Sequence, residues 1–331
     1  MIQCAELNLS IEKNKETAAA FLKGHGLRME ELERLFVLRD EKGNWVGCGG
    51  RYRNVLKCFA LDETRRNEAL LDTLVTALVT DSYRQGYEDL FIYTKSGYGE
   101  MFASFGFSPV ADTGSVVLLH RGSNTVGKVL QRMRVEISPS DLVGAIVVNA
   151  NPFTKGHRYL IESSSRKVDK LIVFVVENDA SRFPFRDRYR LVRDGVSDLK
   201  NVHVFPSTQY IISNATFPSY FLKEKEMADE QHAILDSLIF KEYFVRHFNI
   251  RMRFLGEEPI DMTTNLYNST LLKVLPPECE VIVIPRKTLD EKVISASTVR
   301  KELDKGNFDA IRELVPDVTY RYLEENYGKH S

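Results

Sequence analysis

The sequence predicts a two-domain α/β protein whose second domain is a doubly wound, Rossmann-like sheet, and three observations support this. The chain has 331 residues, more than one hydrophobic core usually organises. Short all-apolar runs, typical of strands buried on both faces of a parallel sheet, alternate with helical segments through the second half. A stretch rich in Gly, Ser and Asn between 122 and 141 separates the halves. We therefore expect domains at 1–125 and 142–331, joined by a linker at 126–141.

Composition excludes several classes of protein. The formal net charge is −1, which does not favour binding to nucleic acid or to an anionic membrane. No apolar run approaches the roughly 18 residues of a membrane helix, and the N-terminus lacks a signal-peptide pattern. The four cysteines have no C-x-x-C spacing, so we expect reduced thiols in a cytoplasmic protein and no protein-bound metal.

The first half is predicted to contain several strands and two helices. Asp40 to Asn44 supplies turn chemistry between two strands. Apolar residues recur with a helical period from 68 to 83, and Gly106 has the position of a helix C-cap. We expect strands at 35–38, 45–50, 54–61 and 90–93, helices at 68–83 and 101–107, and one last strand after Gly106.

In the second half the alternation is regular, which favours a parallel sheet with helical crossovers. We expect strands at 144–148, 171–176, 202–205, 253–256 and 281–284, and helices at 156–168, 186–199, 220–248 and from 297 onward.

The most informative stretch, 149–158, joins the first buried strand to a helix. Ligands in such sheets bind beyond the carboxyl ends of the strands, and a helix N-terminus there suits phosphate. Gly156 allows a close backbone approach, and Thr154 and His157 could reach one phosphate group. His157 would then stabilise charge that develops on the α-phosphoryl oxygens. The alternative is that these residues only cap a helix.

A second stretch, Ile294 to Arg300, begins a late helix. Its serines could simply satisfy the first helical N–H groups. Arg300 would lie on the same face as Ser297, one turn further on, where it could reach a triphosphate.

Other candidates near this edge each have two interpretations. Arg182, Arg186 and Arg188 could contact the β- and γ-phosphates or form a solvated helix start, although arginine at a helix start opposes the helix dipole. Lys155 could touch phosphate or remain exposed. Glu257 and Glu258 could bind ribose or a metal or form a polar turn, and residues 213–220 could line an acyl pocket or form a loop.

The two motifs, T-x-G-H at 154–157 and I-S-A-S-T-V-R at 294–300, resemble those of the T-x-G-H nucleotidyltransferase superfamily. Further stretches make nearly the whole chain resemble the citrate lyase ligase family; they are N-P-F-T-K-G-H-R-Y-L-I-E (151–162), A-T-F-P-S-Y-F-L-K (215–223), R-F-L-G-E-E-P (253–259) and I-P-R-K (284–287). The resemblance implies His157 and Thr154 as catalytic residues. It implies an ATP site formed by Asn151, Phe153, Thr154, Gly156, His157, Ser295, Ser297, Thr298 and Arg300.

The resemblance also implies a reaction. An AMP-forming acid–thiol ligase would use ATP, with Mg²⁺, and acetate to form acetyl-adenylate and pyrophosphate. The acetyl group would pass to the prosthetic-group thiol of the citrate lyase acyl carrier subunit. Acetate is ionised at pH 7 and needs positioning rather than a base, whereas the sequence leaves the base for the thiol step open.

The first half resembles the GNAT acetyltransferase fold, through its element order and F-x-x-F-G-F at 102–107. That family holds acetyl-CoA on a Q/R-x-x-G-x-G/A loop, but Asn67 replaces the first glycine here. This favours a docking role, with Arg65 and Arg66 as phosphate contacts. Two other functions stay open: a phosphopantetheine or nicotinamide mononucleotide type of adenylyltransferase, and an acetyltransferase whose second domain only senses nucleotide.

Overall fold

The computed structural model describes residues 2–65, 69–177, 181–211, 218–222, 225–257, 262–286, 288–289 and 292–328. Contacts divide the chain into two compact units. Unit 1 comprises Met1–Val126 and Phe217–Leu235, and unit 2 comprises Gly127–Thr216 and Asp236–Ser331. In the part of the chain that is described, no helix combines the length and apolar character needed to cross a bilayer.

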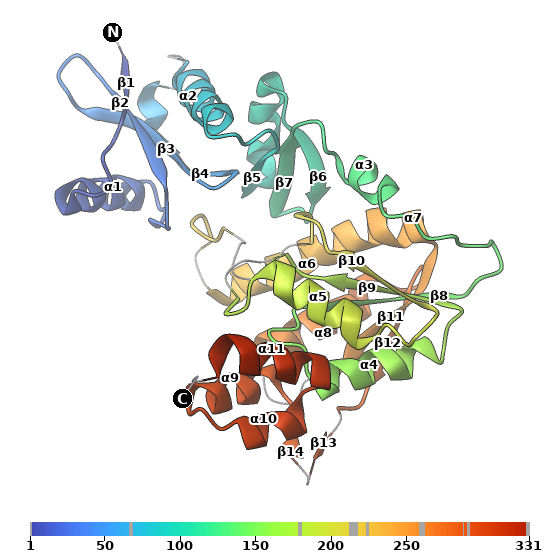
Figure 1. Cartoon of the computed structure of the whole chain (residues 1–331). Coiled ribbons are helices and arrows are strands. Elements are labelled where there is room, and N and C mark those ends of the chain that lie inside the picture. The colour runs from blue at the N-terminus through green and yellow to red at the C-terminus, as the bar shows by residue number, and fades with distance from the viewer. Residues whose placement is uncertain are drawn as a thin grey trace. The chain divides into compact units, whose positions relative to one another are not determined.

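Unit 1 is built on a seven-stranded sheet in the order β1-β2-β3-β4-β5-β7-β6 (Figure 1). Neighbouring strands are antiparallel except β4 and β5, which are parallel. The strands are β1 (Gln3–Glu6), β2 (Arg34–Arg39), β3 (Trp45–Tyr52), β4 (Val55–Leu61), β5 (Leu90–Lys95), β6 (Ser108–Asp112) and β7 (Val116–Arg121). The helices are α1 (Glu12–Gly24), η1 (Glu63–Arg65), α2 (Leu70–Arg84) and η2 (Ser96–Phe105).

The core of unit 1 lies between α2 and the sheet. The helical period predicted the buried face of α2, because Leu74, Val75 and Leu78 are all fully buried against strand residues. Gly106 ends η2 in the left-handed region, as expected of a glycine cap, although η2 is a 3₁₀ helix that begins at Ser96.

Unit 2 contains a five-stranded sheet in the order β10-β9-β8-β11-β12, in which every pair is parallel. The strands are β8 (Val143–Val148), β9 (Lys170–Val175), β10 (Val202–Pro206), β11 (Ile250–Gly256) and β12 (Glu280–Ile284). This confirms the doubly wound α/β prediction. The strand order reverses between β8 and β11, so the ligand crevice of such a sheet is expected at the carboxyl ends of these two strands.

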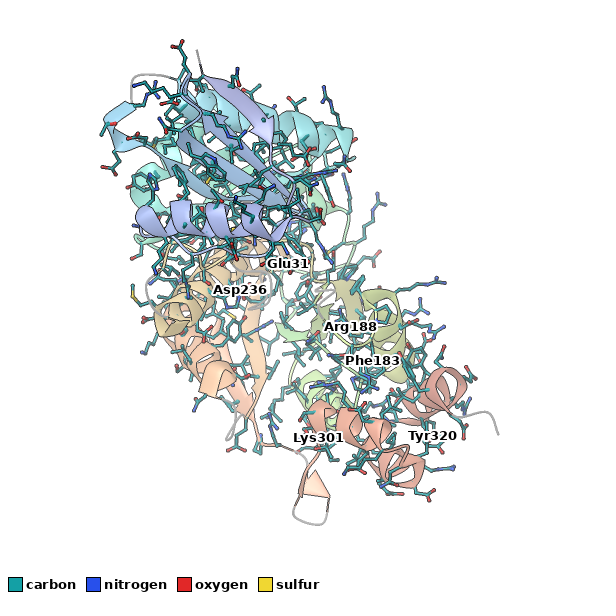
Figure 2. The ribbon with its side chains drawn as sticks, turned by 90° about the vertical axis from the view of Figure 1, so that its left-hand side faces the viewer. Glu31, Phe183, Arg188, Asp236, Lys301 and Tyr320 are labelled. Carbon is teal, nitrogen blue, oxygen red and sulfur yellow. The ribbon has the colours of Figure 1, made fainter. Side chains whose placement is uncertain are left out.

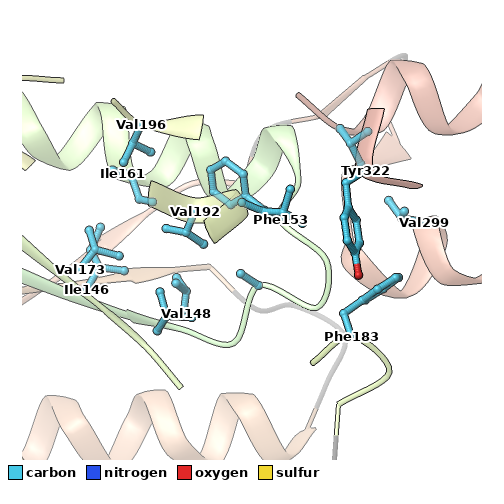
Figure 3. Close-up of a cluster of buried hydrophobic side chains, with 14 of the residues drawn as sticks. Ile146, Val148, Phe153, Ile161, Val173, Phe183, Val192, Val196, Val299 and Tyr322 are labelled. Atoms are coloured by element: carbon cyan, nitrogen blue, oxygen red, sulfur yellow. The ribbon is translucent and has the colours of Figure 1, made fainter. Parts of the chain in front are cut away.

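Helices cover both faces of this sheet. The helical elements of unit 2 are α4 (Lys155–Ser165), α5 (Phe185–Gly195), the π-helix η3 (Phe240–Val245), α7 (Arg246–Phe248), α8 (Met262–Val274), α9 (Ala296–Asp304), α10 (Phe308–Leu314) and α11 (Asp317–Tyr327). Helix α6 (Lys225–Ile239) belongs to unit 1 as far as Leu235. On one face, β8 and β9 pack against α4, α5, α9 and α11 and form a hydrophobic core. Figure 3 shows Phe153, Val192 and Ile161 within this core. On the other face, Phe174 of β9 contacts the rings of Phe240 and Phe244.

Several elements differ from the sequence predictions. The pattern missed β1, because all four of its residues are exposed, and α1, because only Ala18 and Leu22 of its residues are buried. The linker predicted at 126–141 stays a prediction, and helix α3 (Val126–Gln131) lies within it. The prediction that 220–248 is mostly helical is confirmed by α6, η3 and α7, although Tyr220 itself lies in a turn and α6 begins at Lys225. A short hairpin, β13 (Thr288–Leu289) with β14 (Lys292–Val293), was not expected.

Candidate active site

The T-x-G-H segment forms a capping box at the start of α4. The Thr154 hydroxyl accepts a hydrogen bond from the His157 backbone N–H at 3.3 Å. In return, the Thr154 backbone N–H donates to Nδ1 of His157 at 3.1 Å. These two reciprocal hydrogen bonds between Thr154 and His157 therefore fix the conformation of the first turn of α4. Thr154 is only 1% exposed and its hydroxyl contacts His157, while its predicted contact with phosphate stays a prediction.

His157 is fixed as a neutral hydrogen-bond donor. Because Nδ1 accepts from the Thr154 N–H, the ring proton lies on Nε2. Burial, followed by the positive charge of Arg286, lowers the pKa of His157 to about 4. The imidazole is therefore uncharged at neutral pH, and it can donate from Nε2 without first being protonated.

Gly156 joins the two motifs. A Cβ at this position would lie 3.1 Å from the carbonyl oxygen of Ile294, so the missing side chain lets the second motif approach. The close approach of Gly156 to a ligand stays a prediction. In addition, Nη1 of Arg300 donates to the carbonyl oxygen of Asn151 at 2.6 Å. The structure thus places the beginnings of α4 and α9 side by side, although about 140 residues separate them in the chain.

The hydroxyl groups of the second motif form a cluster at the N-terminus of α9. Ser295 is the N-cap, and its Oγ accepts from the Thr298 backbone N–H at 3.1 Å. The same oxygen lies 2.9 Å from Oγ of Ser297 and 2.8 Å from Oγ1 of Thr298. Ser295 therefore has the capping role weighed from the sequence, while Ser297 is exposed and accessible to a ligand.

The flanking cations differ in their contacts. Arg182 forms an ion pair with Asp304 at 2.6 Å and donates to the Arg300 carbonyl oxygen, so it lies beside the second motif. Arg186 is exposed. Nζ of Lys155 donates to the carbonyl oxygen of Arg312 at 3.1 Å, in the last turn of α10, and so holds α4 to that helix.

Arg188 is completely buried, which corrects the interpretation of a solvated helix start, and its contact with phosphate stays a prediction. Its buried side chain is labelled in Figure 2 together with that of Phe183. It donates to main-chain carbonyl oxygens that follow two parallel strands. The acceptors are Asn149 O and Val176 O, both at 2.7 Å, and Phe183 O at 3.0 Å. Arg188 therefore fastens the ends of β8 and β9 to the start of α5.

Phe153 packs in the core next to the site, and its predicted place in the ATP site stays a prediction. Its side chain is fully buried in the core of unit 2, where it faces Gly195 of α5 and stacks on the ring of His157 with centroids 6.1 Å apart. The ring of Phe153 therefore packs against the ring of His157. Asn151 contributes its carbonyl to Arg300, and its Oδ1 accepts from the Phe183 N–H at 3.2 Å.

Sequence reasoning missed Arg286 as a site residue. It follows β12 at the carboxyl edge, Nε donates to the carbonyl oxygen of Glu257 at 2.5 Å, and its charge acts on His157. The only sequence signal was its place in the stretch 284–287. Among the other candidates, Arg66, Asn67, Glu258, Pro259, Lys287 and residues 213–217 lie outside the described residues.

Comparisons with known proteins match most of the chain. The family described as "Citrate lyase ligase C-terminal domain" matches residues 143–323. The "[Citrate [pro-3S]-lyase] ligase" of Escherichia coli (strain K12) is 38% identical over 96% of this chain and 93% of that protein. The protein of the same name from Klebsiella pneumoniae is 35% identical over 95% of this chain and 94% of its own length.

Two further similarities cover parts of the chain. A "Phosphopantetheine adenylyltransferase" of Streptococcus sanguinis (strain SK36) is 39% identical over 70 residues, which are 20% of this chain and 43% of that protein. A GNAT-family acetyltransferase structure from Staphylococcus aureus is 15% identical with a TM-score of 0.31, and the match covers 37% of this chain and 98% of that chain.

Proposed function

Because the chain belongs to the citrate lyase ligase family, we propose that it uses ATP to acetylate the prosthetic-group thiol of the citrate lyase acyl carrier subunit. In the first step an acetate oxygen attacks the α-phosphorus of ATP, the bond to the β-phosphate oxygen breaks, and pyrophosphate leaves. In the second step the thiol sulfur attacks the acetyl carbon of acetyl-adenylate, the thiol proton is released, and AMP leaves.

The observation that carries this proposal is the neutral, oriented His157 at the start of α4. Its Nε2–H is a fixed donor, and the α4 N-terminus adds backbone N–H groups and the positive end of the helix dipole. Negative charge that develops on the α-phosphoryl oxygens would meet donors that need no reorganisation. Acetate is already a carboxylate, so the first step needs no base.

Cations support departure of pyrophosphate. Arg300 lies within α9, and Arg182 contacts its carbonyl oxygen and the carboxylate of Asp304, the last residue of that helix. Arg286 acts on His157 from the end of β12. Guanidinium groups bind phosphate oxygens in pairs and keep their charge. Within the described residues, no group of three or more His, Cys, Asp or Glu side chains could hold a metal. We therefore propose that Mg²⁺ enters with ATP, carried by the phosphates as part of the substrate.

We also propose that the protein is cytoplasmic, as expected from its cysteines. All four are free, and Cys48, Cys58 and Cys279 are buried as thiols. Burial raises the pKa of Cys279 to about 11, so this thiol carries little charge at neutral pH. Such unreactive thiols suit a reducing compartment.

Acetate-dependent exchange of labelled pyrophosphate into ATP tests the proposed first step. With ATP and Mg²⁺ but no carrier protein, acetate is expected to support exchange, because acetyl-adenylate is a high-energy mixed anhydride that pyrophosphate readily reverses. The measurement is the rate of label entering ATP at fixed enzyme concentration, with no added acid as the baseline.

A second nucleophile makes this assay decisive. Exchange that ignores acetate but responds to phosphopantetheine would contradict the ligase and favour the adenylyltransferase activity named for the Streptococcus sanguinis protein. An acetyltransferase with a nucleotide sensor would show no exchange with either compound.

Arg300 is expected to bind the leaving pyrophosphate. Arg300→Ala should weaken ATP binding at least about tenfold more than AMP binding, because a charged hydrogen bond to phosphate contributes about 1.5–3 kcal/mol. Calorimetric titration with both nucleotides measures this difference. The matched control is Arg166→Ala at the opposite end of α4, whose side chain is 74% exposed. An equal loss for ATP and AMP would show that Arg300 acts only by holding the Asn151 carbonyl.

A further inference from the structure

Asn149 lies at the point of unit 2 where the strand order reverses. It directly follows β8, and the reversal falls between β8 and β11. Ligands of doubly wound sheets bind in the crevice at the carboxyl ends of two such strands. Asn149 is exposed, whereas Val148 before it and Ala150 after it are buried. Of these three side chains, only that of Asn149 is therefore accessible at the expected crevice.

The backbone turn after β8 is strained and is held from both sides. Ala150 has a φ of 50°, in the left-handed region that a residue with a Cβ rarely adopts. Arg188 donates to the carbonyl oxygen of Asn149 at 2.7 Å, and Arg300 donates to the carbonyl oxygen of Asn151 at 2.6 Å. Strain that the surrounding structure maintains in this way is concentrated at functional sites, so it points to a function of this turn.

The side-chain amide of Asn149 has a fixed orientation. Its Oδ1 accepts from Nη1 of Arg188 at 2.9 Å and from Oγ of Ser181 at 3.2 Å. A guanidinium group only donates, so the amide atom that Arg188 contacts must be the oxygen. Because Arg188 is completely buried, it holds this oxygen in place. The two N–H groups of Nδ2 therefore lie on the other branch of the amide, in an orientation that Arg188 and Ser181 determine.

Nδ2 of Asn149 is available to a ligand. Among the residues that the structure describes, it has no hydrogen-bond partner. An oriented amide donor of this kind suits an acceptor oxygen of a substrate. In the proposed first step, His157 donates to the α-phosphoryl oxygens and Arg300 binds the leaving pyrophosphate. The reactant that still needs a donor is the carboxylate that attacks.

We infer that Asn149 binds the carboxylate substrate, with Nδ2 donating to the carboxylate oxygen that does not attack. This inference rests on the proposed function, in which the other acetate oxygen attacks the α-phosphorus. A hydrogen bond to one oxygen orients the carboxylate and so positions the other oxygen for attack. The bound oxygen becomes the carbonyl oxygen of acetyl-adenylate, which gains negative charge when the thiol sulfur attacks. Nδ2 then stabilises that charge as well.

Two variants of Asn149 distinguish substrate binding from a structural role. Asn149→Asp keeps an oxygen for Arg188 and Ser181 but replaces the Nδ2 donor with a second carboxylate oxygen, which repels acetate. Asn149→Ala removes both atoms. In the exchange of labelled pyrophosphate into ATP, we expect the KM for acetate to rise at least about tenfold in the alanine variant and further in the aspartate variant. The Kd for ATP, measured by calorimetry, should stay near the wild-type value in the alanine variant.

Asn8→Asp is the matched control, because Oδ1 of the exposed Asn8 in unit 1 also accepts two hydrogen bonds, both from Ser10. It should leave the KM for acetate unchanged. A wild-type KM in Asn149→Asp would overturn the inference, because holding Arg188 and Ser181 would then be the whole role of Asn149. Equal losses for acetate and ATP in Asn149→Ala would also overturn it. A wild-type protein without acetate-dependent exchange would overturn the proposed function, and the inference with it.

Discussion

Replacement of His157 by alanine is expected to lower the rate of acetyl-adenylate formation at least about 100-fold, the usual effect of removing one fixed donor from developing charge. The measurement is pyrophosphate release in a single turnover at saturating ATP and acetate. His157 also completes the capping box of α4, so we expect a stability loss of about 1 kcal/mol besides the kinetic effect. Near-normal turnover would remove His157 from the mechanism.

Two conservative variants distinguish the contribution of His157 to helix capping from its contribution to catalysis. His157→Asn places an oxygen near the position of Nδ1, which can still accept from the Thr154 N–H, but it lacks the distant donor at Nε2. His157→Gln places an amide near Nε2. We therefore expect the asparagine variant to be nearly as slow as alanine although it is more stable, and the glutamine variant to recover part of the rate. The opposite order would assign the whole effect to helix capping.

The lowered pKa of His157 adds a pH readout. Its pKa is about 4 in the folded protein, against about 6.5 for an unperturbed histidine, so the unfolded chain takes up the proton first as pH falls. The contribution of neutral His157 to stability is therefore complete above about pH 6.5 and is lost as pH falls towards 4. The wild-type protein should lose more stability over this interval than His157→Asn, as measured by urea unfolding at each pH.

Replacement of Arg188 by methionine is expected to have the largest effect on stability, a loss of at least about 3 kcal/mol in unit 2. Methionine preserves much of the length of the side chain but leaves the carbonyl groups of Asn149, Val176 and Phe183 buried without this donor. Each buried acceptor that loses its partner costs about 1–3 kcal/mol. ATP binding should also weaken, because Asn149 begins the loop that leads to Thr154.

Hydrogen exchange locates this effect. Peptides that cover β8 and β9 should lose protection from exchange in Arg188→Met. The fluorescence of Trp45, the single tryptophan, reports on β3 of unit 1, and the unfolding midpoint that it measures should not change. Arg186→Met, two residues earlier and exposed, is the matched control and should change stability by less than about 0.5 kcal/mol. Unchanged protection of β8 and β9 would contradict the role assigned to Arg188.

The sequence by itself determined the parallel sheet of unit 2 and the two motifs at its carboxyl edge. Strands such as Val143–Val148 are apolar throughout because both faces are covered, and that run is visible without coordinates. Thr154 and Ser295 were also predictable as helix starts, because capping is decided by neighbours within three residues. The face of α2 that packs on unit 1 followed from its helical period.

Only the tertiary structure decided what the individual side chains at the site contact. Arg188 and Arg186 stand two residues apart and are the same residue type, yet one is buried on carbonyl groups and the other is exposed. The burial of Phe153 beneath His157 and the position of Arg286 likewise arise from elements distant in the chain. Tyr220 has an apolar neighbourhood that fits a helix, but its hydrogen-bond partners are Tyr93 of β5 and Arg28. A local pattern records which residues can be buried, whereas the partner that buries them is set by chain segments far away in the sequence.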